Sequence, residues 1–323
     1  MDKYKLSERG DEIKSHLPEL IKIKTRYMNI PFLKYSKIYY ILSGLLFVFA
    51  VFSIVFFGLN LSSDLLGGSI LEVEFEKRPE NSAILNQLKE FNLGEVTVQP
   101  AGQAGVILRM NEVEEETHQK IILKLNELSE LKELRFESIG PVIGRELRQK
   151  TLILVAVSLL ALLVYIAISF RKVAFPFSSW QYGLVSLFTL FFDILITIGL
   201  LAYLGRFSNL QFNIPIITAL LTILGYTIND KVIVLDRIRE NSLTQGHLNS
   251  KELLEKSLNQ VFFRSISTGS CTLLVLAALF FFGGQTLKYF SLTLIAGIIV
   301  GTYSSLFLVS PFLLGWLKFR KKT

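Results

Sequence analysis

The chain has 323 residues, of which 51% are hydrophobic and 19% are charged, and its formal net charge is +7. Soluble domains usually carry about 25% charged residues, so this composition indicates a membrane protein. The positive charge would favour a nucleic-acid partner in a soluble chain. Here the basic residues flank apolar segments, and an anionic membrane face explains them better. The single cysteine, Cys271, excludes an internal disulfide, and the three histidines are too scattered to predict a metal site.

Six apolar segments are each long enough to cross a bilayer of roughly 30 Å, which needs about 20 residues in a helix. We predict transmembrane helices at 38–59, 151–170, 183–204, 214–235, 265–283 and 289–317. The last segment is longer than a bilayer requires, so we expect it to tilt or to extend past the interface. The first follows a long polar tail and lacks a small-residue cleavage site, so we do not expect a cleaved signal.

The distribution of lysine and arginine predicts the orientation of these helices. Residues 1–37, the turn at 171–172 and the chain end at 318–323 are basic, whereas the loops at 205–213 and 284–288 carry one basic residue each. We therefore expect both termini in the cytoplasm. In chain order, the expected parts are a cytoplasmic basic tail at 1–37, the first helix at 38–59, an extracytoplasmic domain and linker at 60–150, helices two to six at 151–317 with a cytoplasmic loop at 236–263, and a basic cytoplasmic tail at 318–323.

The extracytoplasmic segment has the pattern of a folded α+β domain. Apolar spacing predicts strands at 69–75, 95–99, 105–110 and 133–137, and helices at 81–91 and 114–128. The order β-α-β-β-α-β is the split ferredoxin-like pattern, and about 70 residues suffice for one modest core. We therefore expect a polytopic α-helical membrane protein with a small ferredoxin-like domain between its first two helices. The acidic residues Glu112 and 114–116 are interpreted as a solvated face and a favourable helix start.

The most informative segment is 220–235, because an Asn–Asp pair lies inside a stretch apolar enough to cross a bilayer. A carboxylate at membrane depth costs a few kcal/mol on insertion scales, so it usually has a partner or a function. Asp230 is expected about 8 Å from the inner edge, and Arg264 opens the fifth helix at the same edge. Burial favours the neutral form of the acid, and a nearby arginine favours the charged form. Because the two effects compete, the acid can take up and release a proton as the local geometry changes, as a proton carrier must. The two residues could equally form a static lock, or Arg264 could extend to the interface.

Three further polar residues lie in predicted membrane helices. Asp193, near the middle of the third helix, is either a polar contact to another helix or a member of a proton path. Asn229 could hydrogen-bond across helices or position Asp230. We expect Lys231 to point about 100° away from Asp230 around the helix and to extend its amine to the inner interface. The small residues that cluster in helices five and six are interpreted as sites of close helix packing.

The segment 224–241, Leu-Gly-Tyr-Thr-Ile-Asn-Asp-Lys-Val-Ile-Val-Leu-Asp-Arg-Ile-Arg-Glu-Asn, resembles the helix-four block of the SecF family in the resistance-nodulation-division superfamily. The likeness covers nearly all of 38–316. It includes the segment 138–147, which leads into the second helix, and the double-glycine motif at 64–68. The family-motif residues are Asp64, Gly67, Gly68, Gly140, Pro141, Gly144, Gly225, Asp236, Arg237, Arg239 and Glu240.

The resemblance implies an accessory subunit of the Sec translocase in the bacterial cytoplasmic (inner) membrane. In that picture the proton motive force aids export of unfolded preprotein, and the partners are SecD and the SecYEG channel. Asp230 and Arg264 match the intramembrane acid–base pair to which proton transport is assigned, and Asn229 and Asp193 are further candidates. The outer domain is expected to engage the emerging polypeptide or to help couple its release.

The chain departs from the family pattern at three positions. Lys231 replaces the usual small hydroxyl residue beside the aspartate, Phe192 stands where histidine is common, and Leu65 replaces an aromatic residue. These differences concern the details of the proton path and not the membership of the family.

Two other functions are compatible with the pattern of helices. The chain could be half of a proton-driven small-molecule or lipid exporter, whose two six-helix halves form repeats, but the compact outer domain favours protein secretion. A purely structural adaptor would have dispensable intramembrane charges. The sequence has no phosphate-binding glycine loop, nucleophile elbow or metal-ligand cluster, so we expect neither an enzyme nor a cofactor.

Overall fold

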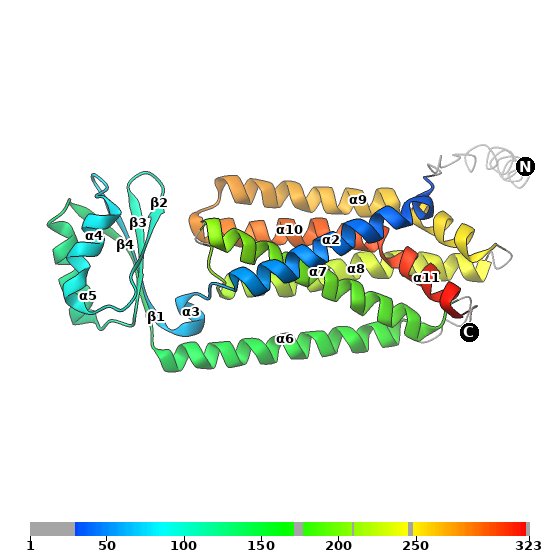
Figure 1. Ribbon diagram of the computed structural model, residues 1–323, viewed down its shortest axis with the longest axis horizontal. Coiled ribbons are helices and arrows are strands. Elements are labelled where there is room, and N and C mark those ends of the chain that lie inside the picture. Colours follow the sequence, from blue (N-terminus) through cyan, green and yellow to red (C-terminus); the bar gives the residue numbers. More distant parts are fainter. Residues whose placement is uncertain (1–29, 171–176, 209, 245–247, 321–323) are drawn as a thin grey trace, which may run out of the picture.

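The computed structural model describes residues 30–170, 177–208, 210–244 and 248–320 as a helical bundle with a small sheet domain at one end (Figure 1). Six helices in these ranges are long and apolar enough to cross a membrane, as the sequence predicts. The expectations for most of the basic tail, for the turn at 171–172 and for the last three residues fall outside the described residues.

The bundle consists of the six predicted membrane segments, several of them longer than predicted. The helices are the short 3-10 helix η1 (Phe32–Tyr35), α2 (Ser36–Phe57), α6 (Pro141–Ser169), α7 (Ser179–Ser208), α8 (Ile214–Thr244), α9 (Ser250–Phe282), α10 (Gln285–Phe307) and α11 (Val309–Arg320). α2 begins and α11 ends at the end of the bundle away from the sheet domain (Figure 1).

The segment 236–263, predicted as a cytoplasmic loop, is mostly helical. α8 continues to Thr244, and α9 begins at Ser250. The Asn249 side chain caps this start by accepting hydrogen bonds from the backbone N–H groups of Lys251 and Glu252. The second helix likewise starts earlier than predicted, directly after the last strand.

The last apolar segment, which we expected to tilt or to extend past the interface, is divided into two helices at Leu308. Pro311 explains the break, because it has no backbone N–H to donate to the carbonyl of Phe307. The helix restarts when the N–H of Phe312 donates to the carbonyl of Leu308 at 3.0 Å.

The sheet domain has the predicted order β-α-β-β-α-β. Its elements are β1 (Gly68–Phe75), α4 (Asn81–Leu88), η2 (Lys89–Phe91), β2 (Thr97–Ala101), β3 (Gly105–Met110), α5 (Glu115–Asn126) and β4 (Leu131–Ile139), preceded by the short helix α3 (Ser63–Leu66). The strands are antiparallel in the order β2-β3-β1-β4, which is compatible with a ferredoxin-like arrangement.

Alternation along β1 explains how this domain forms its core. Leu71, Val73 and Phe75 are buried on one face, where they join Ile84 of α4 and Ile121 of α5 in one apolar cluster. Both helices therefore cover the face of the sheet that lies away from the bundle (Figure 1). The opposite face is left open toward the ends of the long helices.

The acidic start of α5 is the solvated helix N-terminus that the sequence suggested. Glu115 and Glu116 lie in its first turn. The pKa of Glu115 lies below its usual value, mainly because the Gln119 side chain donates a hydrogen bond to this carboxylate. A hydrogen bond with His118 lowers the pKa further. The pKa of Glu116 is lowered by its hydrogen bond and ion pair with Lys120.

We expect the sheet domain to fold when it is produced alone as residues 67–140, because its core is closed by its own two helices. Circular dichroism should show a cooperative thermal transition. Val73→Asp, which buries a charge in this core, should abolish the transition. A fragment without a cooperative transition would mean that the domain depends on the membrane helices.

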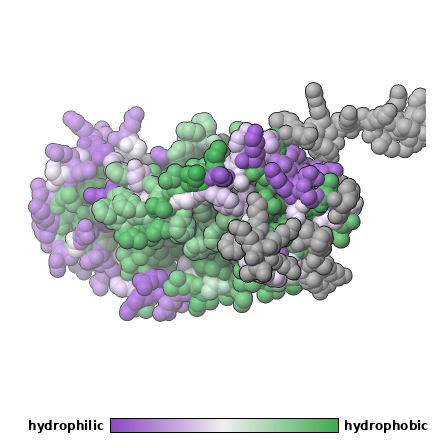
Figure 2. All heavy atoms as spheres, turned by 45° about the vertical axis from the view of Figure 1, so that its right-hand side comes forward, coloured by the Kyte–Doolittle hydropathy of each residue, from purple (hydrophilic) through white to green (hydrophobic). Residues whose placement is uncertain are grey.

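The bundle has a buried centre and an exposed periphery. More than half of the apolar stretch is buried in α7, in α8 and in the α10–α11 segment, but less than a fifth in α2, α6 and α9. Figure 2 shows apolar residues across the middle of the visible face, with polar residues gathered toward the two ends. This distribution suits helices whose outer sides contact lipid, and it makes polar groups in the three central helices the unusual feature.

Candidate functional site

A buried ion pair joins the three central helices. The Lys231 ammonium on α8 donates to Oδ2 of Asp193 on α7 at 2.5 Å and to Oγ of Ser304 on α10 at 3.0 Å. Both charged side chains are 0% exposed. The expectation that Lys231 extends to the interface is therefore wrong. Its expected edge lay near residue 235, but α8 continues to Thr244, so Lys231 lies deeper than the sequence indicated.

Small residues on α10 allow this approach of α8 and α10. A side-chain carbon added to Gly297 would collide with Ile223, and one added to Gly301 would collide with Thr227. Ser304 continues this stripe by one helical turn and meets the lysine. Its hydroxyl donates to the carbonyl of Gly301 at 3.1 Å, so it is oriented to accept from the ammonium. The prediction that small residues serve close packing is confirmed on this face of α10.

Asp193 of the ion pair and the nearby acid Asp230 each keep one acceptor oxygen without a partner among the described residues. Oδ1 of Asp193 and Oδ2 of Asp230 are buried, and neither has a hydrogen-bond partner among the described residues. The Thr227 hydroxyl lies close to the Asp193 carboxyl but does not make a hydrogen bond of good geometry. Buried polar atoms are normally hydrogen-bonded, so these oxygens are sites at which a proton or a water molecule would be accommodated.

Asp230 and Arg264 are not in contact in this structure. Asp230 is 3% exposed and faces the bundle interior, whereas Arg264 lies on the exposed side of α9. No ion pair within 4 Å joins them in the described part of the chain, although the Arg264 charge still acts on the Asp230 carboxyl. Asn229 is exposed and makes no hydrogen bond to Asp230 among the described residues, so it does not position the carboxyl.

Of the expected proton-transport residues, the structure thus places two acids in the centre and leaves Asn229 and Arg264 outside. Sequence reasoning missed that Lys231 is the partner of Asp193. A signal was present, because two opposite charges in neighbouring membrane segments are each costly alone and are stabilised when paired. The pairing was not predicted because the inner edge of the membrane was placed near residue 235, too early along α8.

The glycines of the two shorter family motifs meet at the junction between the sheet domain and α6. Gly67 has a φ of +87°, and an added side-chain carbon would lie 2.7 Å from Cα of Pro141. A carbon added to Gly144 would lie 3.0 Å from the backbone carbonyl carbon of Leu66. Segments far apart in the chain therefore pack backbone to backbone, which only glycine permits. Gly140 is the N-cap of α6, and Gly68 begins β1.

The remaining motif residues have simpler settings. Gly225 has open space around it, and the Asp64 side chain falls outside the described part of the structure. The four charged motif residues at 236–240 of α8 form pairs one turn apart on its polar end, with Arg237 bound to Glu240 at 2.9 Å and Arg239 to Asp236 at 3.3 Å. Such exposed pairs solubilise the helix end and contribute little stability.

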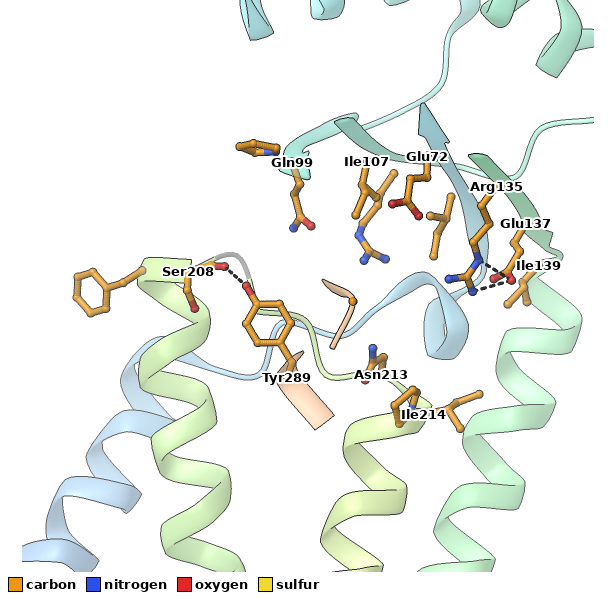
Figure 3. Close-up of a pocket in the computed structure, with 16 residues that line it drawn as sticks. Glu72, Gln99, Ile107, Arg135, Glu137, Ile139, Ser208, Asn213, Ile214 and Tyr289 are labelled. Carbon is orange, nitrogen blue, oxygen red and sulfur yellow. Dashed lines mark hydrogen bonds and ion pairs between the residues drawn. The ribbon is translucent and has the colours of Figure 1, made fainter. Parts of the chain in front are cut away.

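A cleft of about 710 Å³ lies between the open face of the sheet and the ends of α7, α8 and α10. Figure 3 shows Glu72 and Ile107 pointing from the sheet toward Asn213 on the bundle side. Arg135 pairs with Glu137 at 2.6 Å on the same face (Figure 3). The lining is a mixture of apolar and oppositely charged groups, without the convergent set of one charge that a small anion or a metal ion would require.

Three comparisons relate the chain to known proteins. Residues 119–319 match the family described as protein export membrane protein SecD/SecF, C-terminal. The chain is 35% identical over 301 residues to the protein translocase subunit SecF of Thermobaculum terrenum, covering 89% of this chain and 94% of that protein. It is 36% identical over 301 residues to the SecF subunit of Sebaldella termitidis, covering 91% and 94%.

A solved structure is also similar. The crystal structure of SecDF from Thermus thermophilus, described as a translocon-associated membrane protein, matches with a TM-score of 0.79 at 32% identity. The match covers 90% of this chain, and the chain spans 39% of that SecDF chain.

Proposed function

This chain belongs to the SecD/SecF family of protein-export membrane proteins, and we propose that it is an accessory subunit of the Sec translocase that couples the proton motive force to preprotein export. The observation that carries the proposal is the group of buried charges in the three central helices. Asp193, Lys231 and Asp230 lie where charges are costly, within residues 119–319, which match the family.

The energy source of the proposed function is a gradient. A membrane potential of 100 mV supplies about 2.3 kcal/mol for each charge moved, which is enough for a modest conformational change per proton. The proton-transport group consists of Asp230, Arg264, Asn229 and Asp193. Asp230 is the carrier, and Arg264 approaches it in another conformation, since the arginine side chain is long and lies on the neighbouring helix. The subunit works without enzymatic chemistry or a cofactor.

The proposed location is the bacterial cytoplasmic membrane, with both termini in the cytoplasm and the sheet domain outside. The basic residues at the chain ends and the sparse charge of the opposite loops support this orientation. SecD is the proposed partner, because the similar SecDF chain is more than twice as long as the part that this chain matches. SecYEG and the unfolded preprotein complete the proposed assembly.

Inverted membrane vesicles test the proposal. Vesicles from cells that produce the chain should export a preprotein faster when a proton gradient is imposed, and vesicles from cells that lack only this chain should lose most of that acceleration. Export driven by ATP alone should remain in both. If the gradient accelerates export equally with and without the chain, the proposed coupling is wrong.

A further inference from the structure

Asp193 and Lys231 form a buried ion pair, and the proposed role of Asp230 as proton carrier assigns no function to this pair. One ammonium group binds a carboxylate of α7 and a hydroxyl of α10, and it projects from α8, the helix that also holds Asp230. Neither charged side chain is exposed. Asp193 is thus neutralised by a neighbour from the same chain in the state described here.

Burial links the protonation of Asp193 to the position of Lys231. If Asp193 accepted a proton while the lysine stayed in place, the ammonium would be a buried charge without a counter-ion, which is strongly unfavourable. A proton therefore reaches Asp193 stably only when the ammonium finds another acceptor. Because the same ammonium holds Ser304, its departure also removes a hydrogen bond between α8 and α10.

The available acceptor is Asp230. Its Oδ2 atom is buried and has no hydrogen-bond partner among the described residues. The Lys231 charge already acts on this carboxyl in the present state, as does the more exposed Arg264. The other polar groups around the pair are the hydroxyls of Thr227 and Ser304, which do not carry the negative charge that an ammonium requires.

We propose that Lys231 is a further functional residue, which blocks Asp193 while bound to it and moves to Asp230 when Asp193 takes up a proton. This rests on the proposed proton-driven function and adds a second acid that works in alternation with the first. The incoming proton converts the Asp193 carboxylate to the acid, and Lys231 remains an ammonium paired with the Asp230 carboxylate. Release of the proton returns the lysine to Asp193 and restores its bond to Ser304.

Single and paired substitutions test the proposal in the full chain with its export partners. Asp193→Asn and Lys231→Met each disable the exchange, and the double variant removes both charges, which avoids an uncompensated buried group. The readout is the ratio of export with and without a proton gradient, per amount of membrane-inserted protein. All three variants should lose the gradient effect, and the double variant should be no better than either single variant.

Two serine substitutions on α10 provide a test and its matched control. Ser304→Ala removes the hydroxyl that binds the ammonium and should lower the gradient effect. Ser291→Ala on the same helix removes a buried hydroxyl whose hydrogen bonds among the described residues go to the carbonyls of Leu287 and Lys288, and it should leave the effect unchanged. Neither substitution changes a charge, so both variants should fold.

The outcomes separate this inference from the proposed function. If the double variant Asp193→Asn, Lys231→Met keeps the full gradient effect while Asp230→Asn loses it, the ion pair only holds the helices together. The inference is then overturned. If the Asp230→Asn variant also keeps the gradient effect, the proton-coupled function itself fails. If the serine variants behave alike, Ser304 has no part in the exchange, and the proposed link to α10 is wrong.

Discussion

Asp230→Asn is expected to abolish the acceleration of export by a proton gradient while leaving folding and membrane insertion intact. The amide has nearly the shape of the carboxyl, but it cannot take up and release a proton near neutral pH. Because Oδ2 of Asp230 has no hydrogen-bond partner among the described residues, the substitution breaks no contact there. Export into inverted vesicles, compared with and without an imposed gradient, measures the effect.

Asp236→Asn is the matched control for this substitution. Asp236 lies on the same helix and is exposed, and its ion pair among the described residues is the surface pair with Arg239 at 3.3 Å. Surface pairs of this kind contribute about 0–1 kcal/mol, so this variant should export like the unaltered protein. An Asp230→Asn variant that responds to the gradient as well as the Asp236→Asn variant does would remove Asp230 from the proton path.

Gly199→Val is expected to cause a large loss of stability of the helical bundle. Gly199 on α7 packs against the backbone of α2, and an added side-chain carbon would lie 2.9 Å from the carbonyl oxygen of Ala50. Backbone cannot move aside as a flexible side chain does. Overpacking typically costs about 1–3 kcal/mol, and a branched residue against backbone belongs at the upper end. Thermal unfolding of the protein in detergent should show a clearly lower midpoint.

Gly225→Val separates this packing effect from the general effect of valine in a membrane helix. Gly225 also lies in a membrane-spanning helix, and apart from the adjacent residues and the backbone of that helix, no atom of the described residues lies within 4 Å of a carbon added there. Its unfolding midpoint should stay near that of the unaltered protein. Equal midpoints for the two valine variants would mean that α2 and α7 are not held at the distance seen here.

Segment length and apolar periodicity predicted the six membrane helices and the order of strands and helices in the sheet domain. Both patterns are local in the sequence, so they can be recognised without knowledge of the tertiary contacts. The break at Leu308 was less visible, because a proline such as Pro311 can either kink or end a helix and the sequence does not say which.

The site was only partly predictable, because it depends on which helix faces meet. Asp193 and Asp230 were identified as costly charges, and the structure buries both in the central helices. The partner of Asp193 was not identified, because Lys231 was assigned to an interface that in fact lies further along α8. The close approach of Gly67 to Pro141 could not be predicted from the sequence either, because these residues are far apart in the chain.

In the proposed function, Asp230 carries protons across the membrane. Proton movement in sealed vesicles tests it most directly, with a pH-sensitive dye inside vesicles that contain this chain, its partner SecD, the SecYEG channel and a preprotein in transit. After an acid pulse outside, vesicles with the unaltered chain should acidify faster than vesicles with Asp230→Asn at the same protein content. Equal rates of acidification in the two preparations would mean that Asp230 does not carry protons.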